Sequence, residues 1–305
     1  LRGNDAIGPE RQSEFETGLD FSFLGGKIAI DATYYIKKVD DLLLRSQVPS
    51  SSGQTTAVVN AATMENKGLE IGLTMNLVNK EDLKWTSTTQ FWNNRSKVTR
   101  LDIPSYTTGG FADFLGQFRI KEGHSPTEII GVGDNPDEDG LVVFGDAQPD
   151  FQMSFLNSVT YKKLEFMMLW HWKQGGENIN LSALLSDLSG TSPDFDKIDL
   201  DPEGNLGNGG YRLSQLGANT GPYIENAGYM RMREVALYYT LPNFFGDAVK
   251  SIKIGASGNN LINFFEYRSY DPEVSNFGGQ GLSTGVEVTP FPSSKRYNFH
   301  IIAKF

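Results

Sequence analysis

The sequence predicts an all-β chain whose antiparallel strands form the carboxy-terminal portion of a transmembrane β-barrel. Three observations carry this prediction: many segments alternate apolar and polar side chains, short turns alternate with long polar connections, and the chain ends on an aromatic residue. The composition agrees, because 12% of the 305 residues are aromatic and 33 are glycine, as is typical of strands joined by turns.

The segment 295–305 shows the alternation at the chain end. Apolar side chains occupy every second position from Tyr297 to Phe305, and Ile302 is the one exception between them. A period of two indicates a strand with one apolar face. A soluble domain gains little from such a strand, whereas the outward face of an outer-membrane barrel meets lipid.

Eight further segments show the same two-residue period. The first two are joined by a glycine-rich turn at 24–26, the alternation is clearest in 68–78, and it is weakest in 83–97. Each segment has roughly the 10 residues that a tilted strand needs to cross a bilayer. The strands predicted in this way are 14–23, 27–38, 68–78, 83–97, 151–160, 164–173, 229–240 and 251–260.

The connections between these strands alternate in length. Short turns follow the first, third, fifth and seventh strands, and long connections occupy about 39–67, 98–150, 174–228 and 261–294. Short turns at one end and long loops at the other are typical of a transmembrane barrel. The last strand then runs toward the short-turn end, which places Phe305 at the periplasm.

An odd count of nine strands does not make a complete barrel, because single-chain bacterial barrels have even numbers. The opening residues 1–10 are typical of the end of a long loop. We therefore expect a carboxy-terminal fragment of a larger barrel.

Composition excludes several classes of function. The chain has 27 basic and 37 acidic residues, a net charge of −10, which argues against binding nucleic acid. It has no cysteine, so disulfides, thiolate zinc sites and cysteine nucleophiles are excluded. The three histidines, His124, His171 and His300, lie far apart in sequence, and no catalytic or nucleotide-binding motif occurs. We expect no enzymatic activity.

One acidic segment has the spacing of a calcium-binding loop. Oxygen-bearing side chains fall at positions 1, 3, 5 and 12 of the segment 135–146, and Gly140 stands at position 6. Asn replaces the usual first Asp, and Asp replaces the usual final Glu. The spacing predicts bound Ca²⁺ or Mg²⁺ in an extracellular loop, and the alternative is an acidic turn without metal. The predicted ligands are Asn135, Asp137, Asp139 and Asp146.

Several motifs, in order along nearly the whole chain, resemble one family. They include Asn66-Lys-Gly-Leu-Glu70, the Tyr-x-Arg start at Tyr229, Tyr239-Thr-Leu-Pro242, the Asn-Leu ending at Leu261, Asp271-Pro-Glu273, Pro290-Phe-Pro292 and the closing strand. Together they resemble the carboxy-terminal half of the SusC/RagA-type TonB-dependent outer-membrane transporters of Bacteroidetes. That family carries an Asp-x-Asn-x-Asp-Gly segment similar to the predicted metal loop.

The resemblance implies a fold and a function. It implies that 1–305 is the end of a 22-stranded barrel whose plug domain and TonB box are absent from this chain. It further implies TonB-dependent uptake of large nutrients, glycan oligosaccharides or peptides, across the outer membrane of a Gram-negative bacterium. The partners would be outer-membrane lipid, a SusD-like surface lipoprotein and TonB, which acts through the plug.

Two other functions stay open at this point. One is a soluble β-sandwich or lectin-like module that binds glycans, and the other is a barrel scaffold in an outer-membrane machine. The direction of the apolar faces distinguishes the module from the barrel.

Aromatic side chains have two expected roles. Pairs at strand ends are expected to form an interfacial girdle. Four loop tyrosines are candidates for stacking on a sugar or peptide ligand. These are Tyr211, Tyr223, Tyr267 and Tyr270.

Overall fold

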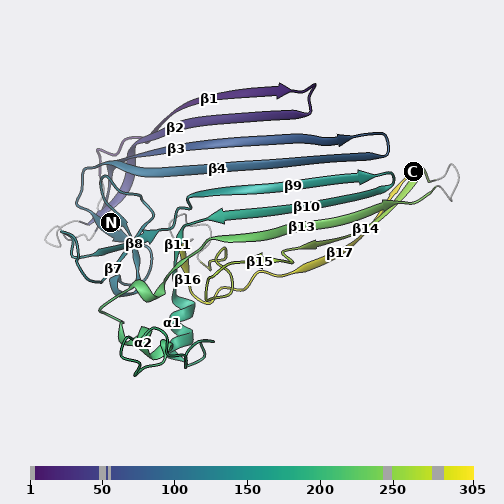
Figure 1. Ribbon diagram of the computed structural model, residues 1–305. Coiled ribbons are helices and arrows are strands. Elements are labelled where there is room, and N and C mark those ends of the chain that lie inside the picture. The colour runs from purple at the N-terminus through teal and green to yellow at the C-terminus, as the bar shows by residue number, and fades with distance from the viewer. Residues whose placement is uncertain (1–3, 48–52, 54–55, 243–248, 277–284) are drawn as a thin grey trace.

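The computed structural model describes residues 4–47, 53, 56–242, 249–276 and 285–305. Its main feature is an antiparallel sheet in which nine long strands follow one another in chain order, and the short β15 (Asn263–Phe264) pairs with one of them (Figure 1). The nine are β1 (Arg11–Phe23), β2 (Ile28–Gln47), β3 (Thr56–Asn79), β4 (Leu83–Leu101), β9 (Phe151–Tyr161), β10 (Leu164–Gln174), β13 (Tyr229–Thr240), β14 (Ser251–Asn259) and β17 (Arg296–Lys304). The predicted all-β wall of nine strands is confirmed, and within the described residues the sheet stays open, with β1 and β17 at its edges.

One predicted long connection is wrong. Most of 39–67 is strand, because β2 continues to Gln47 and β3 begins at Thr56. The register shifts between Val39 and Leu43, and Asp41 adopts a φ of 60°. This irregularity breaks the two-residue alternation, so the pattern ended at 38 although the pairing resumes beyond it.

The short turns gather at one end of the sheet, and the chain ends beside them. Leu24 and Lys162 adopt φ values of 54° and 53° in two of these turns. The amide of Lys250 donates to the carbonyl of Lys304 at 2.8 Å. The carboxyl terminus therefore lies at the short-turn end (Figure 1), as the parity of the strands predicts.

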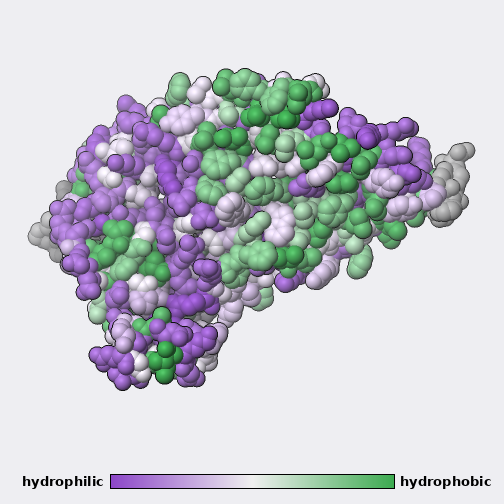
Figure 2. Space-filling model, viewed as in Figure 1, coloured by the Kyte–Doolittle hydropathy of each residue, from purple (hydrophilic) through white to green (hydrophobic). Residues whose placement is uncertain are grey.

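The register places apolar and polar residues on opposite faces of the sheet. Phe21 pairs with Ile30, which pairs with Leu73, and Phe166 pairs with Leu237 across the other half. Paired residues in neighbouring strands point to the same side, so these rows build one continuous apolar face. Figure 2 shows this face as a mainly green area over the strands.

The apolar face is open to its surroundings. Phe299 and Ile301 of β17 are 88% and 80% exposed, and no second sheet of the described residues covers the nine strands. This arrangement contradicts the sandwich alternative, in which such a face would form an internal core. It matches a wall that meets lipid on one side.

A charge on this face is expected to be costly. Leu237 is 47% exposed, and its replacement by Arg should destabilise the protein by about 2–4 kcal/mol, since lipid cannot solvate a guanidinium. Ser158→Arg, on the polar face of β9, is the matched control and should change stability little. Urea unfolding of the protein in lipid vesicles measures both changes in stability, and equal effects would contradict the assignment of faces.

The long connections fold into a packed unit, here called the loop assembly, at the other end of the sheet (Figure 1). One of its sheets contains β5 (Tyr106–Thr108), β6 (Gln117–Ile120), β7 (Glu128–Gly131) and β8 (Val142–Asp146), and the other contains β11 (Glu177–Asn180), β12 (Ile224–Asn226) and β16 (Val286–Glu287). The helices are α1 (Leu181–Leu188), α2 (Asn208–Ser214) and the 3-10 turns η2 (Asp113–Leu115) and η3 (Gly221–Tyr223).

The loop assembly has its own apolar core. Phe118, Ile129 and Ile179 are completely buried, and Leu184 of α1 and Val286 of β16 pack with them. The sequence predicts polar connections here, so this apolar core corrects that prediction.

Among the residues that the structure describes, the helices are too short or too polar to span a bilayer.

Candidate functional site

The polar face of the sheet is the first part of the candidate site. Side chains that alternate with the apolar set lie on this face, and one row across three neighbouring strands contains Glu70, Trp92 and Gln152. Hollows of about 450 and 460 Å³ lie on it, and Trp92 and Gln90 line both. In a barrel wall such a face surrounds the lumen.

A cluster of charged residues, here called the wall clamp, joins the loop assembly to this face. Arg231 of β13 is 1% exposed, and its Nη2 and Nη1 lie 2.6 Å from carboxylate oxygens of Asp271 and Glu273. Arg233 donates from Nη1 to Glu273 at 2.7 Å. Two successive inward side chains of one strand thus hold the segment that follows β15.

Aromatic groups border the wall clamp. The hydroxyl of Tyr229 donates to Glu273 at 3.0 Å, and Arg233 Nη2 donates to Nδ1 of His171 at 2.7 Å. The His171 ring stacks on Trp92 with centroids 5.6 Å apart. The sequence offered no partner for His171, yet two family motifs that it did single out, Tyr-x-Arg and Asp-Pro-Glu, meet here.

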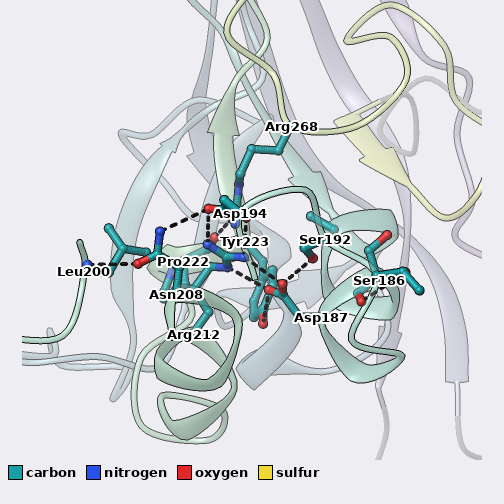
Figure 3. Close-up of polar contacts among 12 residues, drawn as sticks. Ser186, Asp187, Ser192, Asp194, Leu200, Asn208, Arg212, Pro222, Tyr223 and Arg268 are labelled. Atoms are coloured by element: carbon teal, nitrogen blue, oxygen red, sulfur yellow. Dashed lines mark hydrogen bonds and ion pairs between the residues drawn. The ribbon is translucent and has the colours of Figure 1, made fainter. Parts of the chain in front are cut away.

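A second buried ion cluster holds the helical lobe, residues 181–223, together (Figure 3). Arg212 of α2 donates through Nε and Nη2 to the two oxygens of Asp187 in α1, both at 2.7 Å. Its Nη1 and Nη2 donate to the two oxygens of Asp194 at 2.8 and 2.9 Å. The hydroxyl of Tyr223 donates to Asp187 at 3.1 Å.

Ionisation in this cluster follows from its geometry. Burial alone would raise the pKa of Asp187, but hydrogen bonds from Arg212 outweigh burial and hold the pKa below its usual range. Hydrogen bonds from Arg212 also lower the pKa of Asp194. Burial raises the pKa of Tyr223, and the charge of Asp187 adds to the rise. At neutral pH the cluster therefore contains a cation, two carboxylates and a neutral phenol.

The predicted metal ligands find protein partners. Arg119 of β6 donates a hydrogen bond from Nη1 to the carboxylate of Asp137, and Lys121 Nζ lies 2.9 Å from a carboxylate oxygen of Asp139. Asp146 instead accepts from Thr127 Oγ1 at 2.5 Å and from the Gln148 amide at 2.9 Å. Burial would raise the pKa of Asp137, but the hydrogen bond from Arg119 and two backbone amides lower it to about 2.

A metal at this loop stays a prediction. Asn135 adopts a left-handed φ of 58°, and the described residues contain no group of three or more acidic or histidine side chains placed for a metal. A cation would have to displace Arg119 and Lys121 from Asp137 and Asp139. Calorimetric titration with Ca²⁺ and Mg²⁺ tests this prediction, with an Asp137→Asn/Asp139→Asn variant as the control. Binding heat in the wild type but not in the variant would support the metal site. Absence of binding heat in the wild type would rule the site out.

The four candidate tyrosines fall in different environments. Tyr223 and Tyr267 are 2% and 5% exposed, so as they lie they offer no face to a ligand. Tyr270 is 58% exposed, and Tyr211 is half-buried on α2. A ligand role for Tyr211 and Tyr270 stays a prediction. Trp92, on the weakest predicted strand, is an inward aromatic that the sequence did not single out as a ligand group.

Known proteins share this architecture. Residues 1–261 match the family described as "TonB dependent receptor-like, beta-barrel". TonB-dependent receptor P26 of Formosa agariphila is 27% identical over 320 aligned positions, which cover 90% of this chain and 32% of that protein. TonB-dependent receptor SusC of Bacteroides thetaiotaomicron is 20% identical over 99% of this chain and 32% of its own length.

A solved structure agrees in fold. The RagAB peptide transporter superposes with a TM-score of 0.73 at 18% identity, covering 98% of this chain and 36% of that one. The chain thus spans about a third of the length of the relatives it matches.

Proposed function

Because the chain belongs to the TonB-dependent receptor-like β-barrel family of the outer membrane, we propose that it is the carboxy-terminal part of a receptor that imports large nutrients. The cargo class is glycan oligosaccharides or peptides. The chain supplies part of the barrel wall and its extracellular loop assembly. In this proposal the plug, on which TonB acts, is not part of residues 1–305.

One observation carries the proposal: the sheet has an open apolar face and a polar face, and a packed loop assembly closes over one end. The apolar face suits lipid, and the polar face suits an aqueous path. Buried ion pairs at Arg231 and Arg212 hold the loop assembly in a fixed shape. A fixed shape at the extracellular mouth suits capture of a ligand and docking of a partner.

A SusD-like surface lipoprotein is the proposed partner at the loop assembly. Uptake would begin with capture between the two proteins, continue with TonB-driven displacement of the plug, and end with release past the short turns. In this scheme the present chain provides the stationary wall.

The experiment is deletion of the gene in its host, followed by growth on single oligosaccharides or peptides as carbon source. Deletion is expected to abolish growth on at least one large nutrient while growth on the corresponding monomer is unchanged. Complementation with the full gene should restore growth, and complementation with TonB-box deletion should not. Normal growth of the deletion strain on every large nutrient supplied would overturn the proposal.

Affinity purification of the receptor distinguishes the proposed role from a scaffold role. Copurification with a surface lipoprotein supports the importer. Copurification with other outer-membrane machinery, without such a lipoprotein, would favour a barrel scaffold.

A further inference from the structure

Glu287 of β16 is a buried acid without a cation. Its side chain is completely buried, yet neither carboxylate oxygen has a hydrogen-bond partner among the described residues. By contrast, the buried carboxylates of Asp187 and Asp271 each pair with an arginine. An ionised carboxylate is costly to bury without a cation or a donor, so the neutral acid is the form that fits this position.

Glu287 lies where several segments of the loop assembly meet. β16 pairs in parallel with β11 at Glu287 (Figure 1), and the amide of Thr289 donates to Oγ of Ser182 in α1 at 2.6 Å. Nδ2 of Asn178 in β11 donates to the carbonyl of Pro272 at 2.9 Å, so the segment that the wall clamp holds reaches the same junction. A displacement of Glu287 would therefore loosen the contacts among β11, α1 and that segment.

Hydroxyl groups surround the carboxyl of Glu287. Ser182 in α1 and Tyr267 and Ser269 in the segment after β15 lie close enough for their hydroxyls to influence its ionisation. Tyr267 is 5% exposed, and its hydroxyl also lacks a hydrogen-bond partner within the described part of the chain. A neutral acid both donates and accepts hydrogen bonds, so it can share them with these hydroxyls in the absence of a cation.

The charged neighbour of Glu287 has the same sign. Glu225 of β12 accepts from Nε of Arg268 at 2.8 Å and from Nδ2 of Asn180 at 3.1 Å, while β11 presents the neutral amides of Asn178 and Asn180. Burial raises the pKa of Glu287 and the charge of Glu225 adds to the rise, whereas the nearby hydroxyls act in the opposite direction. Because Arg268 is engaged by Glu225, it does not compensate a charge on Glu287.

We propose that Glu287 is a proton-dependent latch of the loop assembly, whatever cargo the receptor carries. With its proton bound, the neutral acid lets β16 pack against β11, α1 and the segment after β15. Loss of the proton leaves a buried negative charge, and β16 moves outward so that water can solvate it. The mouth of the receptor therefore becomes looser as pH rises.

The sign of the pH dependence follows from proton binding. When the latch is open, the Glu287 carboxyl ionises at its ordinary pKa of about 4.3, and when it is closed the raised pKa keeps the proton bound to higher pH. The closed state binds more protons, so its stability is complete below the ordinary pKa and falls as pH rises. The closing equilibrium constant should fall by up to about tenfold per pH unit. The pKa values of Asp187 and Asp194 are shifted the opposite way, so acid and alkali loosen different parts of the loop assembly.

Hydrogen exchange of the full receptor in detergent tests the latch between about pH 5 and about pH 9, with correction for the intrinsic pH dependence of exchange. Protection of 177–180 and 286–289 should fall as pH rises, and protection of β9 and β10 should stay constant. Glu287→Gln keeps the size of the side chain but cannot ionise, so its protection should not depend on pH and should exceed that of wild type at the alkaline end. Glu287→Leu gives a second reading if the Gln variant does not fold.

The matched control is Glu266→Gln, which replaces an exposed acid of the segment after β15 and should keep the wild-type pH dependence. Constant protection of the wild type over the whole range would overturn the latch, as would a Glu287→Gln variant that loses protection in parallel with wild type. If both Glu287 variants lose protection at every pH, the junction needs an ionised carboxylate and the latch is wrong. None of these readings requires a cargo, so they stand apart from the uptake function.

Discussion

Arg212→Met is expected to unfold the helical lobe while the nine-strand sheet stays intact. The substitution leaves Asp187, whose side chain is fully buried, without its cation. Removing one partner of a buried pair typically costs about 3–5 kcal/mol, because the remaining charge stays desolvated. Hydrogen exchange of residues 181–223 in the full receptor should rise sharply, and exchange in β9 and β10 should not change.

Two further variants distinguish charge from bulk. Arg95 pairs with Asp150 at the surface, with 51% and 63% of the two side chains exposed, so Arg95→Met should cost less than about 1 kcal/mol. The double replacement Arg212→Met/Asp187→Leu removes the stranded charge and should recover much of the loss. Equal exchange in Arg212→Met and wild type would show that the cluster does not hold the lobe.

The same cluster predicts how the lobe responds to acid. The pKa values of Asp187 and Asp194 lie below their usual range in the folded lobe. The folded state therefore binds fewer protons than the unfolded state, and the stabilisation is complete above the ordinary carboxyl pKa of about 4. It is lost as pH falls from there through the lower folded values. The protection of these amides, corrected for the intrinsic pH dependence of exchange, should fall in that window, and Arg212→Met should remove this pH dependence.

The sequence predicted the strands because their alternation is local. In 68–78 and 164–173 the alternation itself shows which face of the sheet each side chain occupies. The existence, order and direction of these strands could therefore be predicted from the sequence. The prediction failed where β2 carries a bulge near Asp41, since one irregular residue moves the following side chains to the other face.

The loop assembly could not be predicted because its contacts are distant in sequence. β11 pairs in parallel with β16, so Ile179 lies beside Val286, and no local period records such a pairing. The acidic segment 135–146 illustrates the same limit. Its spacing is that of a cation loop, but the cations that bond its carboxylates, Arg119 and Lys121, come from β6 and the residue after it.

The wall clamp was visible only as two separate motifs. Tyr229-x-Arg231 and Asp271-Pro-Glu273 appeared as family resemblances, and the intervening β14 and β15 bring them together. The opposite charges of the two motifs were the available signal, but the path of the chain between them is needed to pair them.

Arg231→Met is expected to release the segment 263–276 from the wall. Arg231 and Asp271 are 1% and 2% exposed, so the substitution strands a buried carboxylate and should cost about 3–5 kcal/mol locally. Glu273 would lose its ion pair with Arg231 but keep its hydrogen bond from Arg233. The detachment of the segment from the wall should therefore start at Asp271. Hydrogen exchange in 263–276 should increase, and a protease should cut there before it cuts the sheet.

Arg231→Lys gives the sharpest control. Lysine keeps the charge but cannot present two parallel donors to Asp271 and Glu273 at once, so protection should fall between wild type and Arg231→Met. Arg100→Met, which breaks exposed pairs with Asp41 and Asp102, should leave 263–276 protected. If Arg231→Met and Arg100→Met exchange alike in this segment, the clamp contributes nothing to holding it. If uptake falls in the order wild type, Arg231→Lys, Arg231→Met, with the barrel still folded, then a fixed loop assembly is a requirement for transport.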